Sequence, residues 1–197
     1  MTRTVAREIA IHFAFELGFS NESAQACLDR KLKPEVFSSL AEEEPLYGEF
    51  PNQKQMVYIR HLVCGVGEHG AELDAYIERY AVGWRFARIS KVAAAIMRVA
   101  MFELLYMPEV PPAAAINEAV ELSKSYEPAE VTSFINGILG TFWREEGKAL
   151  SVLPGGQSAQ AAQPQESVLE DGDLAASSEA PAPEMDKQAE TLEPDRV

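Results

Sequence analysis

Cysteines, long apolar runs and basic residues are all scarce in this chain of 197 residues. Its two cysteines cannot form a disulfide framework, which favours a reducing compartment such as the cytoplasm. No stretch approaches the roughly 18 uncharged apolar residues of a membrane span. The first apolar run is interrupted by Glu8, His12 and Glu16, which argues against a signal peptide. We therefore expect a cytoplasmic protein without a membrane partner.

Basic residues are outnumbered, with 17 Lys and Arg against 31 Asp and Glu and a net charge of −14. Such an excess argues at first sight against nucleic acid, because phosphate binding depends on Lys and Arg. The charge is unevenly spread, however. Residues 148–197 hold 10 acidic and 3 basic side chains, and residues 1–147 hold 21 and 14, so each part carries −7. The segment 85–98 has four basic residues and no acidic one, so local charge is the better guide.

Aromatic residues are absent after Trp143. Residues 148–197 are rich in Ala, Pro, Gln, Ser and Glu, and they include five prolines. Such a segment cannot bury enough apolar surface to offset the entropy lost on ordering. We expect a disordered acidic tail over 148–197 and a single folded domain over 1–147.

Alternation of the kind seen in β-strands is missing, and helical spacing dominates. At about 100° per residue, apolar side chains gather on one face of each predicted helix. The spacing predicts an all-α fold of about seven helices: a first one up to Leu17, then 22–33, 34–40, 53–80, 90–107, 113–126 and about 129–144. The helix over 90–107 is apolar almost all round, which is typical of a central, buried helix.

Two motifs suggest ligand sites but have simpler explanations. Gly65–Gly70 matches G-x-G-x-x-G, yet no strand precedes it and helical spacing continues on both sides, so we interpret it as a helix against which a neighbour packs closely. His61, Cys64 and His69 are too few for zinc, which needs three or four convergent ligands. No nucleophile–base arrangement is present either. We expect no metal, no cofactor and no catalytic centre.

Glu103 falls within the apolar stripe of the helix over 90–107. A buried carboxylate must be paired or hydrogen-bonded, or its pKa rises. A lone acid is not a catalytic constellation, because acid–base chemistry needs a partner and a substrate cleft. We interpret Glu103 as structural, and expect a helix terminus or a nearby Asn or Trp side chain to satisfy it.

The first helix carries a signal for nucleic acid. Arg3 and Arg7 lie one turn apart, and the spacing places both on the face opposite the core stripe. Phe15, outside that stripe, could provide a ring for base stacking. Two arginines are weak evidence by themselves, because a solvated helix face explains them equally well.

Several segments carry a more specific pattern, in this order: VAREIA (5–10), RHLVCGV (60–66), RISKV (88–92), IMRVAMFEL (96–104), INEAVELSK (116–124) and SFINGIL (133–139). Together they resemble the NusB family of bacterial transcription antitermination factors, over residues 3–145. The resemblance implies an all-helical, two-part bundle, in agreement with the helical spacing.

The resemblance also implies RNA binding without catalysis. Members of the family pair with NusE, a small-subunit ribosomal protein, and the pair binds single-stranded boxA RNA in ribosomal RNA leaders within an antitermination complex on RNA polymerase. Their arginine-rich N-terminal segment corresponds to Arg3 and Arg7, and Phe134 corresponds to an aromatic on the RNA side. Glu130 and Ser133 correspond to the NusE contact. Members occur as monomers and as homodimers, so both states stay open.

The sequence departs from the family in ways that bear on binding. Its N-terminal segment has only two arginines, and Ala93 stands where relatives often carry an acid. We expect weak RNA binding by the chain alone and rescue by NusE. An alternative is a helical protein-interaction adaptor that has lost RNA binding. An accessory domain of an RNA methyltransferase is disfavoured, because residues 148–197 do not resemble a cofactor-binding α/β domain.

Overall fold

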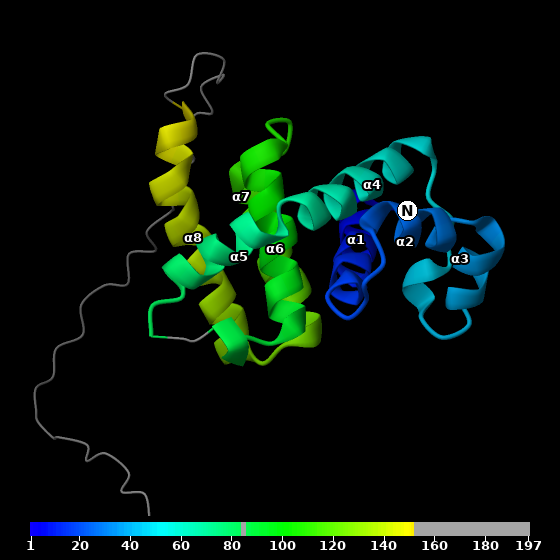
Figure 1. The fold of residues 1–197 in the computed structure, drawn as a ribbon, viewed down its shortest axis with the longest axis horizontal. Coiled ribbons are helices and arrows are strands. Elements are labelled where there is room, and N and C mark those ends of the chain that lie inside the picture. Colours follow the sequence, from blue (N-terminus) through cyan, green and yellow to red (C-terminus); the bar gives the residue numbers. More distant parts are fainter. Residues whose placement is uncertain (84–85, 152–197) are drawn as a thin grey trace, which may run out of the picture. The chain divides into compact units, whose positions relative to one another are not determined.

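The computed structural model describes residues 1–83 and 86–151, so nearly all of the expected tail lies outside the described residues. Within those ranges the chain is helical and contains no strand, which confirms the all-α prediction (Figure 1). The α-helices are α1 Arg3–Leu17, α2 Ala24–Lys31, α3 Pro34–Leu40, α4 Gln53–Glu68, α5 Gly70–Tyr80, α6 Lys91–Tyr106, α7 Pro112–Tyr126 and α8 Ala129–Ser151. Two short 3-10 turns are η1 Pro45–Tyr47 and η2 Phe86–Arg88.

The helices begin where short polar side chains can replace missing backbone partners. The hydroxyls of Thr2, Ser23 and Ser90 each accept a hydrogen bond from the backbone N–H three residues later, in α1, α2 and α6. Asn52 and Gln55 form a reciprocal capping box at the start of α4. These caps fix the helix starts from local sequence alone.

Two helix boundaries differ from the predictions. The segment 53–80 is two helices rather than one, because the chain turns at His69 between α4 and α5. Gly67 and Gly70 flank this turn, and glycine is a poor helix former. The last helix continues to Ser151, beyond both Arg144 and the expected start of the tail at residue 148. The domain division at 147/148 otherwise stays a prediction.

The helix contacts form two groups that share α6. One group joins α1 with α2 and α4, and the other joins α5, α7 and α8. Helix α6 packs on α1 and α4 in the first group and on α5, α7 and α8 in the second (Figure 1). Eleven of its residues are buried, which confirms the prediction of a central helix.

Close packing explains one glycine of the run Gly65–Gly70, namely Gly65 in α4. A Cβ atom added at Gly65 would lie 2.0 Å from Cζ of Phe102, so only glycine lets α6 approach α4 at this point. The interpretation of a small residue beneath a close neighbour is confirmed for Gly65. Gly70 has no such role, because a Cβ there would meet nothing within 4 Å.

The Gly65→Ala substitution should destabilise the fold, because the new methyl group occupies the position of the Phe102 ring. We expect the free energy of unfolding, measured with urea, to fall by about 1–3 kcal/mol. Gly137→Ala is the matched control, since this exposed position within α8 has open space around it and should gain up to about 1 kcal/mol. Equal effects of the two substitutions would contradict this account.

His12 joins α1 to two other parts of the chain. Its Nδ1 lies 3.1 Å from the Tyr47 hydroxyl in η1, and its Nε2 lies 2.8 Å from the Tyr126 hydroxyl at the end of α7. The Tyr126 hydroxyl donates to Glu8 at 2.6 Å. Because the Tyr126 hydroxyl gives its proton to Glu8, His12 Nε2 donates to Tyr126. In a neutral imidazole, Nδ1 then accepts from the Tyr47 hydroxyl.

Burial lowers the pKa of His12 below its ordinary value of 6.5, against the opposing charges of Glu8, Glu44 and Glu16. The unfolded chain therefore binds more protons than the folded chain below about pH 6.5, and the contribution of His12 to stability is lost as the pH falls through its lowered pKa. We expect the free energy of unfolding to fall more steeply between pH 7 and 5 for the wild type than for His12→Gln. The variant His61→Gln, at an exposed site, should show the same pH dependence of the free energy of unfolding as the wild type. Identical pH profiles for all three proteins would contradict the predicted contribution of His12.

Candidate nucleic-acid interface

Arg7 lies in the protein core, with 3% of its surface exposed. Its Nε and one terminal nitrogen donate to the two oxygens of Glu103 at 2.8 and 3.0 Å, and the other terminal nitrogen donates to Glu118 at 3.1 Å. The predicted exposed face with both Arg3 and Arg7 is therefore wrong. Helix α1 packs on both α4 and α6, so two of its faces are buried, and Ala14 is buried as well. The buried guanidinium of Arg7 cannot reach a phosphate.

Glu103 is fully buried, and its interpretation as a structural residue is confirmed, although its predicted partners are wrong. It is satisfied by Arg7 and by the Tyr58 hydroxyl, which donates to Oε1 at 2.5 Å. Burial and the nearby Glu103 charge raise the pKa of Tyr58, so its hydroxyl keeps the donated proton. Burial alone would lower the pKa of Arg7, but hydrogen bonding to Glu103 and the Glu103 charge raise it overall.

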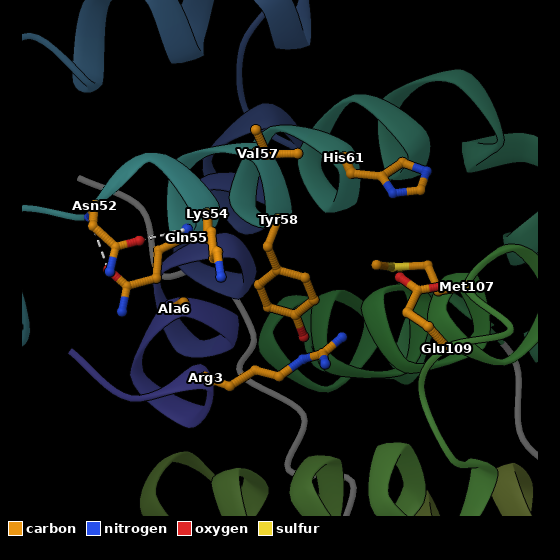
Figure 2. A pocket seen from close by; sticks show the side chains of 10 residues that line it. All are labelled: Arg3, Ala6, Asn52, Lys54, Gln55, Val57, Tyr58, His61, Met107 and Glu109. Atoms are coloured by element: carbon orange, nitrogen blue, oxygen red, sulfur yellow. Dashed lines mark hydrogen bonds between the residues drawn. The ribbon is translucent and has the colours of Figure 1, made fainter.

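Tyr58 connects this buried pair to the surface. The guanidinium carbon of the exposed Arg3 lies 4.6 Å from the centre of the Tyr58 ring, so a cation–π contact holds Arg3 beside α4. A hollow of about 450 Å³ opens here, as Figure 2 shows. Its lining comes from α1, from α4 with its cap, and from the turn after α6: Arg3, Ala6, Asn52, Lys54, Gln55, Val57, Tyr58, His61, Met107 and Glu109.

The hollow combines cationic, aromatic and apolar groups. Lys54 and His61 are exposed on α4, and Val57 between them is 59% exposed. Sequence reasoning found Arg3 but missed these α4 residues. The signal for Lys54, Val57 and His61 is their i, i+3, i+7 spacing, which places them on one face of α4. Cations beside aromatic and apolar surface are the groups that hold phosphates and unstacked bases of single-stranded RNA.

Phe15, the aromatic residue predicted to stack on RNA bases, lies at the far end of α1 from Arg3. Phe15 is half-buried against the core, and its ring centre lies 4.9 Å from that of Phe19. Phe19 is 65% exposed and was missed by sequence reasoning, although its position four residues after Phe15 was the available signal. The pair presents a small aromatic surface.

The remaining predicted residues lie on α8. Glu130 and Ser133 are exposed, as a partner contact requires, and the Ser133 hydroxyl donates to the Ala129 carbonyl at 2.9 Å. Phe134 is half-buried against the core. Helix α8 packs on α5, α6 and α7, whereas α1 packs on α2, α4 and α6, with α6 between them (Figure 1). The predicted RNA residues are therefore divided between α1 and α8, and Phe134 shares α8 with the residues predicted to contact NusE.

A sequence profile of the NusB family matches residues 4–144, which is most of the chain. The chain belongs to the NusB family. Its relatives include the transcription antitermination protein NusB of Carboxydothermus hydrogenoformans, 39% identical over 152 residues that cover 74% of this chain and 99% of the relative. The protein of the same name from Acetivibrio thermocellus is 38% identical over 71% of this chain and 87% of its own length.

Solved structures of the NusB family share the fold. T. maritima NusB superimposes with a TM-score of 0.57 at 26% identity, covering 74% of this chain and 92% of that one. NusB from Aquifex aeolicus matches with a TM-score of 0.55 at 22% identity, over 83% of this chain and 98% of that one.

Within the described ranges, no helix of this family member could span a bilayer, and no cluster of three or more His, Cys, Asp or Glu side chains could hold a metal ion.

The two arginines of α1 should behave differently on substitution. Arg7→Ala leaves Glu103 buried without its cation, and we expect the free energy of unfolding in urea to fall by about 3–5 kcal/mol. Arg3→Ala removes only an exposed cation–π contact and should lower it by less than about 1 kcal/mol. If Arg7→Ala were as mild as Arg3→Ala, the structural role of the buried pair would be wrong.

Proposed function

We propose that this chain is a non-catalytic transcription antitermination factor of the cytoplasm that binds single-stranded boxA RNA of ribosomal RNA leaders together with NusE. The observation that carries the proposal is its membership of the NusB family, with relatives that are named transcription antitermination proteins and are matched over nearly their full length. In this function the pair takes part in an antitermination complex on RNA polymerase.

The RNA-binding part of the proposal starts from Arg3. Its exposed guanidinium lies over Tyr58 in a hollow that Lys54 also lines, so two cations are available to phosphates. Phe15, extended by Phe19, offers rings for base stacking. Phe134 on α8 is proposed as a further base contact. Arg7 is not part of the proposed RNA contact, because its side chain is bound to Glu103 and Glu118.

The NusE contact is proposed on α8, where Glu130 and Ser133 are exposed. Residues 1–147 carry 21 acidic and 14 basic side chains, so a basic partner would supply charge that this chain lacks. RNA held jointly by the two proteins can be bound firmly even when each protein alone offers few phosphate contacts, because linking two binding surfaces raises the effective concentration of the second.

A titration against boxA and scrambled single-stranded RNA, with and without NusE and across salt concentrations, tests the proposal. We expect weak binding alone, tight boxA binding by the pair, and a weakening of about fivefold or more for Arg3→Ala, with a salt slope that is shallower by about 0.7. Lys33→Ala, an exposed cation away from the hollow, is the control. Equal affinity of the pair for boxA and scrambled RNA would refute the function.

The burial of Arg7 favours one second candidate, a helical adaptor that binds proteins and no longer binds RNA. With Arg7 buried, Arg3 is the single exposed arginine of the N-terminal segment 1–7. Arg3→Ala separates the two functions, because unchanged boxA affinity of the NusE pair would favour the adaptor. Arg3 must be changed by itself, since a variant that also lacks Arg7 would lose stability for unrelated reasons.

A further inference from the structure

We propose that the hollow beside Arg3 binds one unpaired nucleotide, with its phosphate on Arg3 and Lys54 and the exocyclic amine of its base on Glu109. The proposal rests on the RNA-binding function proposed above and specifies the kind of base that this site accepts. The hollow has a volume of about 450 Å³ and is open to solvent, as a site for one nucleotide of a longer strand must be.

The phosphate end is formed by Arg3 and Lys54. The Arg3 guanidinium lies over the Tyr58 ring and is exposed to solvent, which leaves N–H groups for phosphate oxygens. Lys54 is exposed and forms no ion pair within the described part of the chain. Two cations that are not neutralised by neighbouring carboxylates can hold one phosphodiester group between α1 and α4.

The base end is formed by the turn after α6. In Figure 2 the Tyr58 ring lies between Lys54 on one side and Met107 and Glu109 on the other. Glu109 is the one carboxylate in the lining, it is exposed, and it has no ion pair among the described residues. Apolar atoms of Val57 and Met107 line the hollow along with it, and they can contact the plane of a base.

The chemistry of Glu109 selects among bases. A carboxylate accepts hydrogen bonds, so it can bind the exocyclic amine of cytosine, adenine or guanine. Uracil carries a carbonyl oxygen in place of the exocyclic amine of cytosine, and its one Watson–Crick donor, N3–H, lies between two carbonyl oxygens that a carboxylate repels. The same negative charge disfavours a phosphate at this end, which orients the nucleotide with its phosphate toward Arg3 and Lys54.

Tyr58 acts in this site as a positioning residue. Its hydroxyl is held by the fully buried Glu103 at 2.5 Å, and Glu103 is in turn held by Arg7. The ring that supports Arg3 is therefore fixed from the protein interior. A guanidinium that is already in place loses less side-chain entropy when it binds a phosphate.

The test measures the binding of fluorescein-labelled rC6 and rU6 by fluorescence polarisation at low salt. It is done with the full chain alone and with the full chain paired with NusE. We expect rC6 to bind about fivefold or more tightly than rU6. Glu109→Ala should bring this ratio close to one without weakening rU6. Glu68→Ala, which removes an exposed carboxylate from α4 outside the hollow, should leave the ratio unchanged. A ratio that Glu109→Ala does not alter overturns the proposal.

Tyr58→Phe tests the positioning role separately, because it keeps the ring and removes the hydrogen bond to Glu103. We expect it to weaken rC6 and rU6 by the same factor and to preserve their ratio, with folding checked by circular dichroism. Unchanged affinity for both probes would overturn the positioning role.

The nucleotide site and the proposed function can fail separately. If the wild-type NusE pair binds boxA RNA normally while Glu109→Ala keeps its base preference, the nucleotide site fails and the proposed function stands. A wild-type pair that does not distinguish boxA from scrambled RNA defeats the proposed function itself.

Discussion

The buried ion pair between Arg7 and Glu103 is the interaction on which the rest of this structure depends. Removing two charges from water costs several kcal/mol per ion, and only good geometry with further hydrogen bonds offsets that cost. Here Arg7 donates to both oxygens of Glu103, and Tyr58 and Glu118 complete the set. The four side chains come from α1, α6, α4 and α7. A shift of α1 against α6 would leave a buried charge without its partner, and a shift of α4 or α7 would remove one of the further hydrogen bonds of the pair.

This interior constraint determines what the surface can present. Glu103 fixes the Tyr58 hydroxyl, the Tyr58 ring supports Arg3, and Arg3 forms one wall of the hollow. Arg3 and Arg7, one turn apart and identical in chemistry, therefore have different roles because they meet different helices. Arg7 fixes the frame and Arg3 is available to a ligand. The same short segment of α1 therefore holds a buried arginine that the fold requires and an exposed arginine.

The sequence was sufficient for most of the fold but not for this division of roles. Apolar spacing located the helices and showed that α6 is central, since nearly every position of α6 is apolar. For α1 the spacing indicated one buried face, whereas α1 packs on both α4 and α6 and buries two. Which second face of α1 is buried depends on tertiary contacts with distant segments, so the sequence of α1 alone does not show it. The requirement that buried Glu103 have a cation was the one available hint at Arg7.

Net charge is a poor guide to binding for a related reason. A count of −14 treats every carboxylate alike, yet Glu103 is neutralised inside the core, and Asp74 is paired with Arg98 by two hydrogen bonds. At physiological salt, exposed charges separated by more than about 8 Å are largely screened from one another. The charges that bear most on the proposed phosphate are therefore those that line the hollow, namely Arg3, Lys54 and Glu109. The acidic total is therefore compatible with the proposed RNA site, because that proposal depends on local cations and not on the sum of charges.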